Sequence, residues 1–81
     1  MSDKSRMPVI GEFVKVVDEF GRLHDGLVTN AWNRTTNVVY VTGDEAKTDQ
    51  YGRQIERQTS CMHKLDTSAP GRFWYFSDET F

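Results

Sequence analysis

Short stretches of alternating polar and apolar residues, separated by turn residues, run along most of this chain. The segment EFVKVV places Val14 and Val16 on one face and Lys15 on the other. Residues 38–42, VVYVT, have the strongest β propensity because of their valines and tyrosine. No segment shows a sustained helical period, and the best candidate for helix is one turn within residues 44–48. The pattern therefore predicts an all-β domain.

Turn residues divide the chain into four or five short strands. The predicted strands are residues 12–17, 23–32, 38–42, 53–63 and 72–76. The second is expected to bend or bulge at Gly26, where a glycine interrupts the strand. So many short strands with tight turns favour a small barrel, because closure removes exposed edges. Alternation predicts a buried core made of the valines Val14, Val16, Val28, Val39 and Val41.

The segments GEFVKV and DGLV resemble the start of SH3-like barrels of the KOW and Tudor kind. In those barrels one glycine leads into two inward valines, and a second glycine precedes another inward valine. The matching positions, within about the first third of the chain, are Gly11, Val14, Val16, Gly26 and Val28. The resemblance implies a small SH3-like barrel of four to five short antiparallel strands. NVVYVTGDE, YGRQIERQTSCMH and GRFWYF are also similar to short uncharacterised proteins encoded by tailed phages, a resemblance that brings no established activity with it.

The length of 81 residues leaves room for one domain, expected as a loose N-terminal tail (1–8), a barrel (9–76) and a C-terminal tail (77–81). A chain this short buries only about 60% of its unfolded surface, so its core is thin. A single cysteine, Cys61, excludes an internal disulfide framework and favours a reducing compartment. The N-terminus has no apolar run suited to a signal peptide or membrane span, so we expect a cytoplasmic protein that does not enter membranes.

Charge limits the classes of partner. The formal net charge is −2, so no global basic field draws the protein to nucleic acid or anionic lipid. Any such binding has to come from a local patch of the surface.

No group of residues in the sequence matches the pattern of a metal site or of a catalytic site. The soft metal ligands are His24, Cys61 and His63, whereas structural zinc usually takes four. Cys61 and His63 share one strand face and superficially suggest a thiolate pair. Nothing in the sequence shows the electropositive pocket that a catalytic cysteine needs, and Cys61 fits better as a small core residue. The paired carboxylates lie in turns or in the tail, and no glycine-rich phosphate loop is present. We therefore predict no metal, no cofactor and no enzymatic activity.

The strand 53–63 carries unusually many hydrogen-bonding side chains. Neither of its faces is cleanly apolar, which predicts a bulge or a strong twist midway. The predicted ligand-binding residues around one rim of the barrel are Arg53, Arg57, Thr59, Ser60 and His63, with Tyr51 and Trp32 as stacking partners. The alternative is that Arg57 pairs with Glu56, Glu45 or Asp44 while the hydroxyls simply face water.

The aromatic run FWYF is the second feature of note. Alternate residues of a strand point in opposite directions, so Phe73 and Tyr75 cannot face the same way as Trp74 and Phe76. We predict that Trp74 and Phe76 form an exposed interface for a partner or a second subunit. The alternative is that the N-terminal MPVI segment covers the exposed pair.

These observations favour a non-enzymatic binding module. On the phage resemblance, it would engage a host protein or nucleic acid through the polar strand 53–63 and nearby aromatics. The alternative function is a small-molecule binder that sequesters an anionic, nucleotide-like ligand, at the interface of a homo-oligomer.

Overall fold

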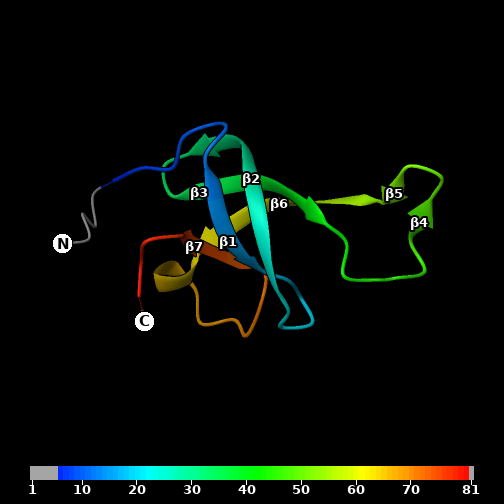
Figure 1. The fold of residues 1–81 in the computed structure, drawn as a ribbon. Helices are drawn as coiled ribbons and strands as arrows, with labels where there is room; N and C mark the ends of the chain where they lie inside the picture. Colours follow the sequence, from blue (N-terminus) through cyan, green and yellow to red (C-terminus); the bar gives the residue numbers. More distant parts are fainter. Residues whose placement is uncertain (1–5, 81) are drawn as a thin grey trace.

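Five strands close into a barrel in the computed structural model, which describes residues 6–80 (Figure 1). The strands, in barrel order, are β1 (Phe13–Val17), β2 (Leu23–Trp32), β3 (Thr35–Val41), β6 (Ile55–His63) and β7 (Phe73–Phe76). β7 closes the ring by pairing with β1 antiparallel and with β6 in parallel. The all-β, small SH3-like barrel predicted from the sequence is confirmed. The β6–β7 pair is parallel because the short helix η1 (Lys64–Asp66) and the loop 67–72 carry the chain between the two strands.

The two valines of β1 fill the barrel interior, and Gly26 lets a neighbouring strand approach them. Gly26 lies opposite Val14, and a Cβ at this position would come within 2.5 Å of Val16 Cγ2. The glycine therefore provides close packing, and the bulge expected at Gly26 is not there. The pairing of β2 with β3 shifts instead between Val28 and Asn30.

The core confirms three of the five predicted valines and corrects two. Val14, Val16 and Val28 are buried, with at most 1% of their surface exposed. Val39 is only half-buried and Val41 is exposed, so their assignment to the core was wrong. The inward residues of β3 are Thr36, Val38 and Tyr40, and Thr42, just after the strand, is also buried. The error arose because β3 has apolar residues at both alternating sets of positions. Val38 pairs with the buried Val28, so the set that contains Val38 points inward and the set that contains Val39 and Val41 points outward.

The predicted interruption of strand 53–63 is a bulge in β6. Val38 pairs with Gln58 and Thr36 with Cys61, so Thr59 and Ser60 together face Asn37. Ser60 has φ 52°, and its backbone N–H donates to Asn37 Oδ1 at 3.0 Å. The extra residue reverses the alternation, which turns Cys61 and His63 inward after Gln58.

The aromatic run of β7 belongs to the core. Trp74 is fully buried and Phe76 is 3% exposed. Their rings meet edge to face at a centroid distance of 4.8 Å, and Trp74 Nε1 donates to the backbone oxygen of Arg34 at 2.9 Å. The prediction of an exposed Trp74–Phe76 interface is therefore wrong, because the thin core takes these rings as its largest members. Phe73 is also buried, with Lys64 Nζ 4.7 Å from its ring centroid.

The residues on either side of the barrel make defined contacts with it. Arg6 pairs with Glu12 and, at 3.2 Å, with Asp78, and its guanidinium lies 3.9 Å from the ring centroid of Phe76. Ser77 Oγ donates to the backbone oxygen of Phe13 at 3.3 Å.

A two-stranded arm projects from the barrel between β3 and β6 (Figure 1). It consists of β4 (Thr48–Asp49) and β5 (Gly52–Arg53), and its residues 44–54 are all exposed. The arm gives the molecule its length, with extents of 42 × 25 × 21 Å. Residues 44–48 form a hydrogen-bonded turn at the start of the arm, closed by Lys47 N–H and the Asp44 carbonyl. Within residues 6–80 no helix has the length and apolar character needed to cross a membrane.

Candidate interaction surface

Several side chains of the barrel strands point away from the core and form what we call the outer sheet face. Its apolar members are Phe13, Leu27, Val39, Val41 and Ile55. Phe13 lies opposite Leu27, and Leu27 lies opposite Val39, so one apolar row crosses β1, β2 and β3. Val41 lies opposite Ile55 and continues the apolar surface onto β6. Cross-strand neighbours at this spacing are in side-chain contact.

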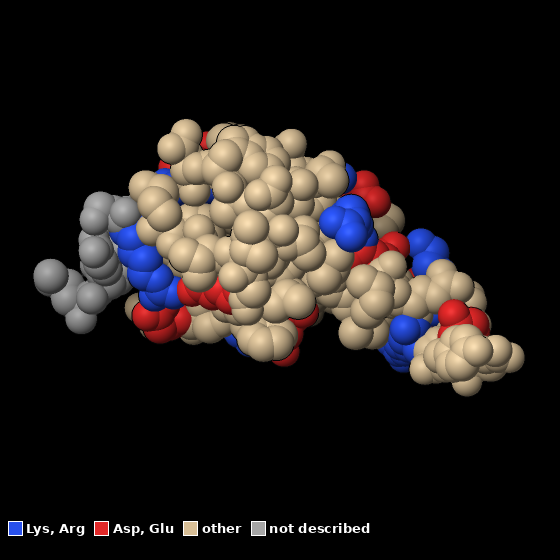
Figure 2. Space-filling model, turned by 90° about the horizontal axis from the view of Figure 1, so that it is seen from above, with Lys and Arg blue, Asp and Glu red and all other residues tan. Residues whose placement is uncertain are grey.

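Much of this apolar surface is open to solvent. Phe13 is 69% exposed, Ile55 61% and Val41 51%. Seen from above, a broad uncharged surface lies over the barrel, and charged side chains gather toward its ends and on the arm (Figure 2). Contiguous apolar surface of this kind is a feature that interaction sites of small proteins share.

Few charges lie among these apolar residues. Lys15 Nζ is 2.5 Å from Asp25 Oδ1, and the two residues are opposite one another on β1 and β2. This contact is the main reason why the pKa of Lys15 is raised. Arg57 lies opposite Val39 and donates to Thr29 Oγ1 at 3.5 Å. The outer sheet face thus has an apolar centre with a polar margin.

The alternative in which Arg57 is neutralised by a nearby carboxylate is not what the structure shows. Among residues 6–80 Arg57 has no ion pair, and Glu56 is held by Lys47 at 2.9 Å. Arg57 is therefore the unpaired cation of the outer sheet face and is available to a partner.

The predicted ligand-binding residues do not come together in one place. Arg57 lies within the outer sheet face, and Thr59 and Ser60 are exposed at the bulge in the same strand. Trp32, 44% exposed, ends β2 at the turn into β3. The structure thus joins Arg57, Thr59 and Ser60 and leaves Trp32 at one end of the barrel.

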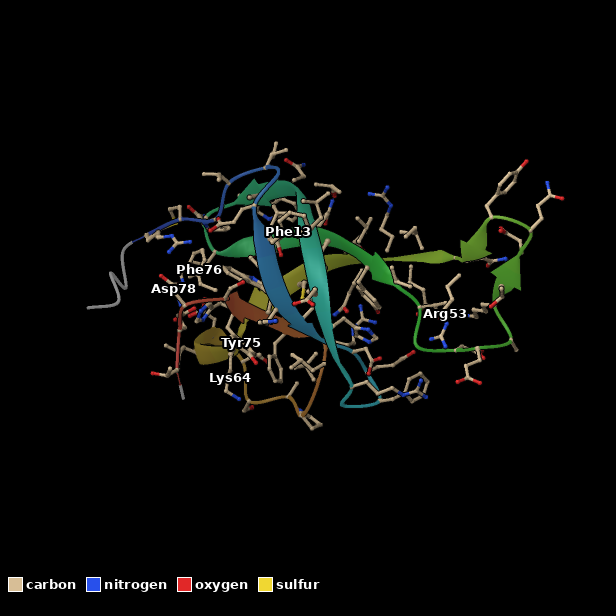
Figure 3. All side chains as sticks on the ribbon, viewed as in Figure 1. Phe13, Arg53, Lys64, Tyr75, Phe76 and Asp78 are labelled. Atoms are coloured by element: carbon tan, nitrogen blue, oxygen red, sulfur yellow. The ribbon has the colours of Figure 1, made fainter. Side chains whose placement is uncertain are left out.

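Two further members of the predicted set lie on the arm. Tyr51 is 89% exposed in the turn between β4 and β5. Arg53 donates to the Thr42 carbonyl at 3.4 Å and pairs with Glu45 at 3.6 Å, so contacts at the arm's base restrain it. Figure 3 shows Arg53 far from Phe76 and Asp78, which lie at the opposite end of the barrel.

His63 is not part of any rim, because its side chain is fully buried. Its Nδ1 accepts from Leu65 N–H at 3.0 Å and lies 2.7 Å from Arg34 Nη2. Since a guanidinium can only donate, Nε2 carries the imidazole proton and donates to Glu79 Oε1 at 2.7 Å. The prediction that His63 lies on the rim is therefore wrong, because the bulge in β6 turns this side chain inward. Its role is to bind the C-terminal segment to the barrel.

The soft ligands considered for metal binding are separated in the same way. His24 Nε2 lies 2.7 Å from Asp18 Oδ2, while Cys61 is buried and accepts from Gln58 Nε2 at 3.5 Å. Burial raises the pKa of the Cys61 thiol to about 12, which keeps it protonated and unreactive. In the part of the chain that is described, no three His, Cys, Asp or Glu side chains gather as a metal site would require.

The apolar members of the outer sheet face were not among the site residues predicted from the sequence. The available signal was the run VVYV, which is apolar at both alternating sets of positions and so supplies an inner and an outer apolar face. Comparison of the chain with family models finds no match. Searches against curated proteins and against solved structures also find none. Functional inference therefore comes from the geometry of this chain.

Proposed function

We propose that the protein is a non-enzymatic binding module whose outer sheet face holds a partner protein. The observation that supports this most is the row Phe13–Leu27–Val39, which crosses three strands and in which Phe13 is exposed and Leu27 and Val39 are half-buried. Interfaces typically have such an apolar centre with a polar rim, and aromatic and arginine side chains contribute most of the binding energy. Phe13 is the aromatic residue of the outer sheet face, and Arg57 is its arginine.

The charge of the face favours a protein over a nucleic acid. Phosphate backbones are bound by several cations at once. The outer sheet face offers Arg57 and the already paired Lys15, so it suits an apolar protein surface with a carboxylate placed to meet Arg57. Three segments resemble phage-encoded proteins, and if the chain is a phage protein, its partner would be a protein of the host.

The polar residues of β6 belong to the same proposal. Thr59 and Ser60 supply hydroxyl groups beside Arg57, as a polar rim would. The anionic, nucleotide-like ligand considered as the alternative has weaker support, because His63 is buried and Arg53 and Tyr51 lie apart on the arm.

The experiment that tests this function is capture of proteins from a host lysate by immobilised wild type and two variants. Phe13→Ser with Ile55→Ser removes apolar side chains from the outer sheet face. Leu65→Ser is the matched control, because Leu65 is also exposed, at 56%, but lies in η1. A specific partner retained by wild type and the control should fall at least about tenfold with the double variant. Equal capture by all three proteins would reject the outer sheet face as the binding surface.

A further inference from the structure

One edge of β6 lies open along most of the strand. On the side of β6 that faces away from β3, β7 pairs with Met62 and His63, where it closes the barrel. Residues 55–58 pair with β3 on their other side, and no strand within residues 6–80 pairs with them on this one. A strand edge that is left open is a template for a further strand.

The alternation of hydrogen bonds identifies the backbone groups on this open edge. Thr42 N–H donates to the Gln54 carbonyl at 3.0 Å, just before β6 begins. Bonded pairs recur at every second residue of an antiparallel ladder, so the next residue to direct its N–H and C=O toward β3 is Glu56. Ile55 and Arg57 therefore direct theirs to the open side, where each offers one donor and one acceptor.

The open edge is accessible from solvent. Ile55 is 61% exposed, and Arg57 is exposed as well. A cleft of about 690 Å³ is lined by Glu56, Arg57 and Gln58, together with the β1–β2 turn, the base of the arm and Arg72. Because Arg72 directly precedes β7, the cleft reaches the β7 side of β6, where a further strand would run at a spacing of about 4.8 Å.

The arm prolongs the same edge. β5 leads into β6, and its two residues are exposed (Figure 1). Gln54 N–H donates to the Lys47 carbonyl at 3.0 Å, and the Gln54 carbonyl accepts from Thr42, so β4 lies on the same side of the chain as β3. The opposite side of β5 therefore continues the open edge of β6.

The side chains of the edge residues define the segment that fits. Side chains directly opposite one another on paired strands are in contact, and opposite charges at such positions are favourable. Arg57 has no ion pair within residues 6–80, so it suits a carboxylate on the added strand. Ile55 lies two residues away on the same face and suits an apolar side chain. The fitting segment thus has an acidic and an apolar residue two positions apart.

We propose that the open edge of β6 binds an extended segment of a partner protein as an added strand, with an acidic side chain opposite Arg57 and an apolar one opposite Ile55. Backbone hydrogen bonds to Ile55 and Arg57 hold the segment, and the two side-chain pairs select it. This mode of binding rests on the proposed function, because the same partner would continue from the added strand onto the outer sheet face.

The test is a two-dimensional amide NMR titration of the wild type with the synthetic peptides TVTDTVT and TVTKTVT at millimolar concentration. In each peptide the central residue and both valines share one face of a strand. TVTDTVT should shift the amides of Ile55 and Arg57 and slow their hydrogen exchange, because both N–H groups gain acceptors. TVTKTVT should bind at least about tenfold more weakly, because its lysine lies opposite Arg57.

Two changes separate an added strand from other modes of binding. Arg57→Glu should reverse the preference, so that TVTKTVT binds more tightly than TVTDTVT. Methylation of the internal backbone nitrogens of TVTDTVT removes its donors and should abolish binding. The proposal is overturned if neither peptide shifts the amides of Ile55 and Arg57. It is equally overturned if the methylated peptide binds as tightly as the unmodified one.

Phe13→Ser distinguishes failure of this proposal from failure of the proposed function. The change alters the outer sheet face on β1 and leaves β6 intact, so TVTDTVT should bind the variant as it binds wild type. Peptide binding together with capture of a partner that does not depend on Phe13 would place the partner on the edge of β6 instead of the outer sheet face. Capture that depends on Phe13, without any peptide effect at Ile55 and Arg57, would reject the added strand alone.

Discussion

Leu27 on β2 lies directly opposite Val39 on β3, and both side chains point away from the core. The adjacent pair, Val28 and Val38, points inward and is completely buried. Two neighbouring strands of one small barrel therefore have an apolar pair on each side. The inner pair stabilises the fold, and we propose that the outer pair serves a partner.

This difference predicts losses of stability of very different size for two adjacent valines. Val38→Ala should reduce the free energy of unfolding by about 1–3 kcal/mol, because it opens a cavity in a thin core. Val39→Ala removes a half-buried side chain and should cost much less than Val38→Ala. Urea denaturation of both variants measures the two values. Equal losses would mean that the assignment of inner and outer positions on β3 is incorrect.

Asp18 should make stability depend on pH in the acid range. Its Oδ1 accepts from the backbone N–H groups of Phe20 and Arg22 at 2.8 and 2.9 Å, and Oδ2 lies 2.7 Å from His24 Nε2. Burial acts to raise the pKa of Asp18, but the hydrogen bonds from His24 and the backbone outweigh it, and the net pKa is lowered. The folded state thus binds fewer protons than the unfolded state.

The resulting stabilisation is present above the unfolded pKa, near 4, and is lost as pH falls through the lower folded value. Asp18→Asn should cost about 1–3 kcal/mol at neutral pH and flatten the loss of stability below pH of about 4. Thermal denaturation from pH 2 to pH 7 measures this. Asp25→Asn, a change at a side chain that is 77% exposed, is the control and should leave the profile close to wild type.

Glu79 should contribute strongly to stability although it lies only two residues from the C-terminus. Its Oε1 accepts from buried His63 Nε2 at 2.7 Å and from Phe76 N–H at 2.8 Å. Glu79→Ala leaves both donors without this acceptor and should cost about 1–3 kcal/mol. Glu79→Gln keeps an acceptor oxygen and should recover part of the loss. Asp78→Ala, at a side chain that is 70% exposed, should change the urea midpoint little; a loss as large as that of Glu79→Ala would contradict the assigned role.

Cys61 should resist modification in the folded state. The side chain is 1% exposed, and burial raises the pKa of its thiol to about 12. A thiol reagent at pH 8 should therefore label the native protein far more slowly than the urea-unfolded protein. Rapid labelling of the native protein would show that the thiol is accessible and would reopen a reactive role for it.

The sequence predicted the fold better than it predicted the residues of the candidate interaction surface. Val14, Val16 and Val28 could be assigned because polar residues alternate with them or a glycine precedes them. The β6 bulge could be expected because neither phase of residues 53–63 is consistently apolar. Both inferences depend on local alternation, which a single sequence records directly.

The errors arose at residues whose local sequence allows either the inward or the outward orientation, so that only contacts with distant parts of the chain decide between them. Val38 and Val39 are chemically identical, and only the pairing with β2 selects which one points inward. His63 has the polarity of a surface residue but is buried because Arg34, Leu65 and Glu79 satisfy its ring nitrogens. Partners as distant in sequence as Arg34 leave no local signal.

The central claim is that the outer sheet face contacts a partner protein, and site-specific photo-crosslinking tests it most directly. A photoreactive amino acid is placed at Val39, within the outer sheet face, and in a second protein at Leu65 as the control. In host lysate we predict a discrete crosslinked species from position 39 that is absent from position 65, and that Phe13→Ser with Ile55→Ser removes it. Crosslinking from position 65 alone, or none from position 39 while a partner is demonstrably bound, would contradict the claim.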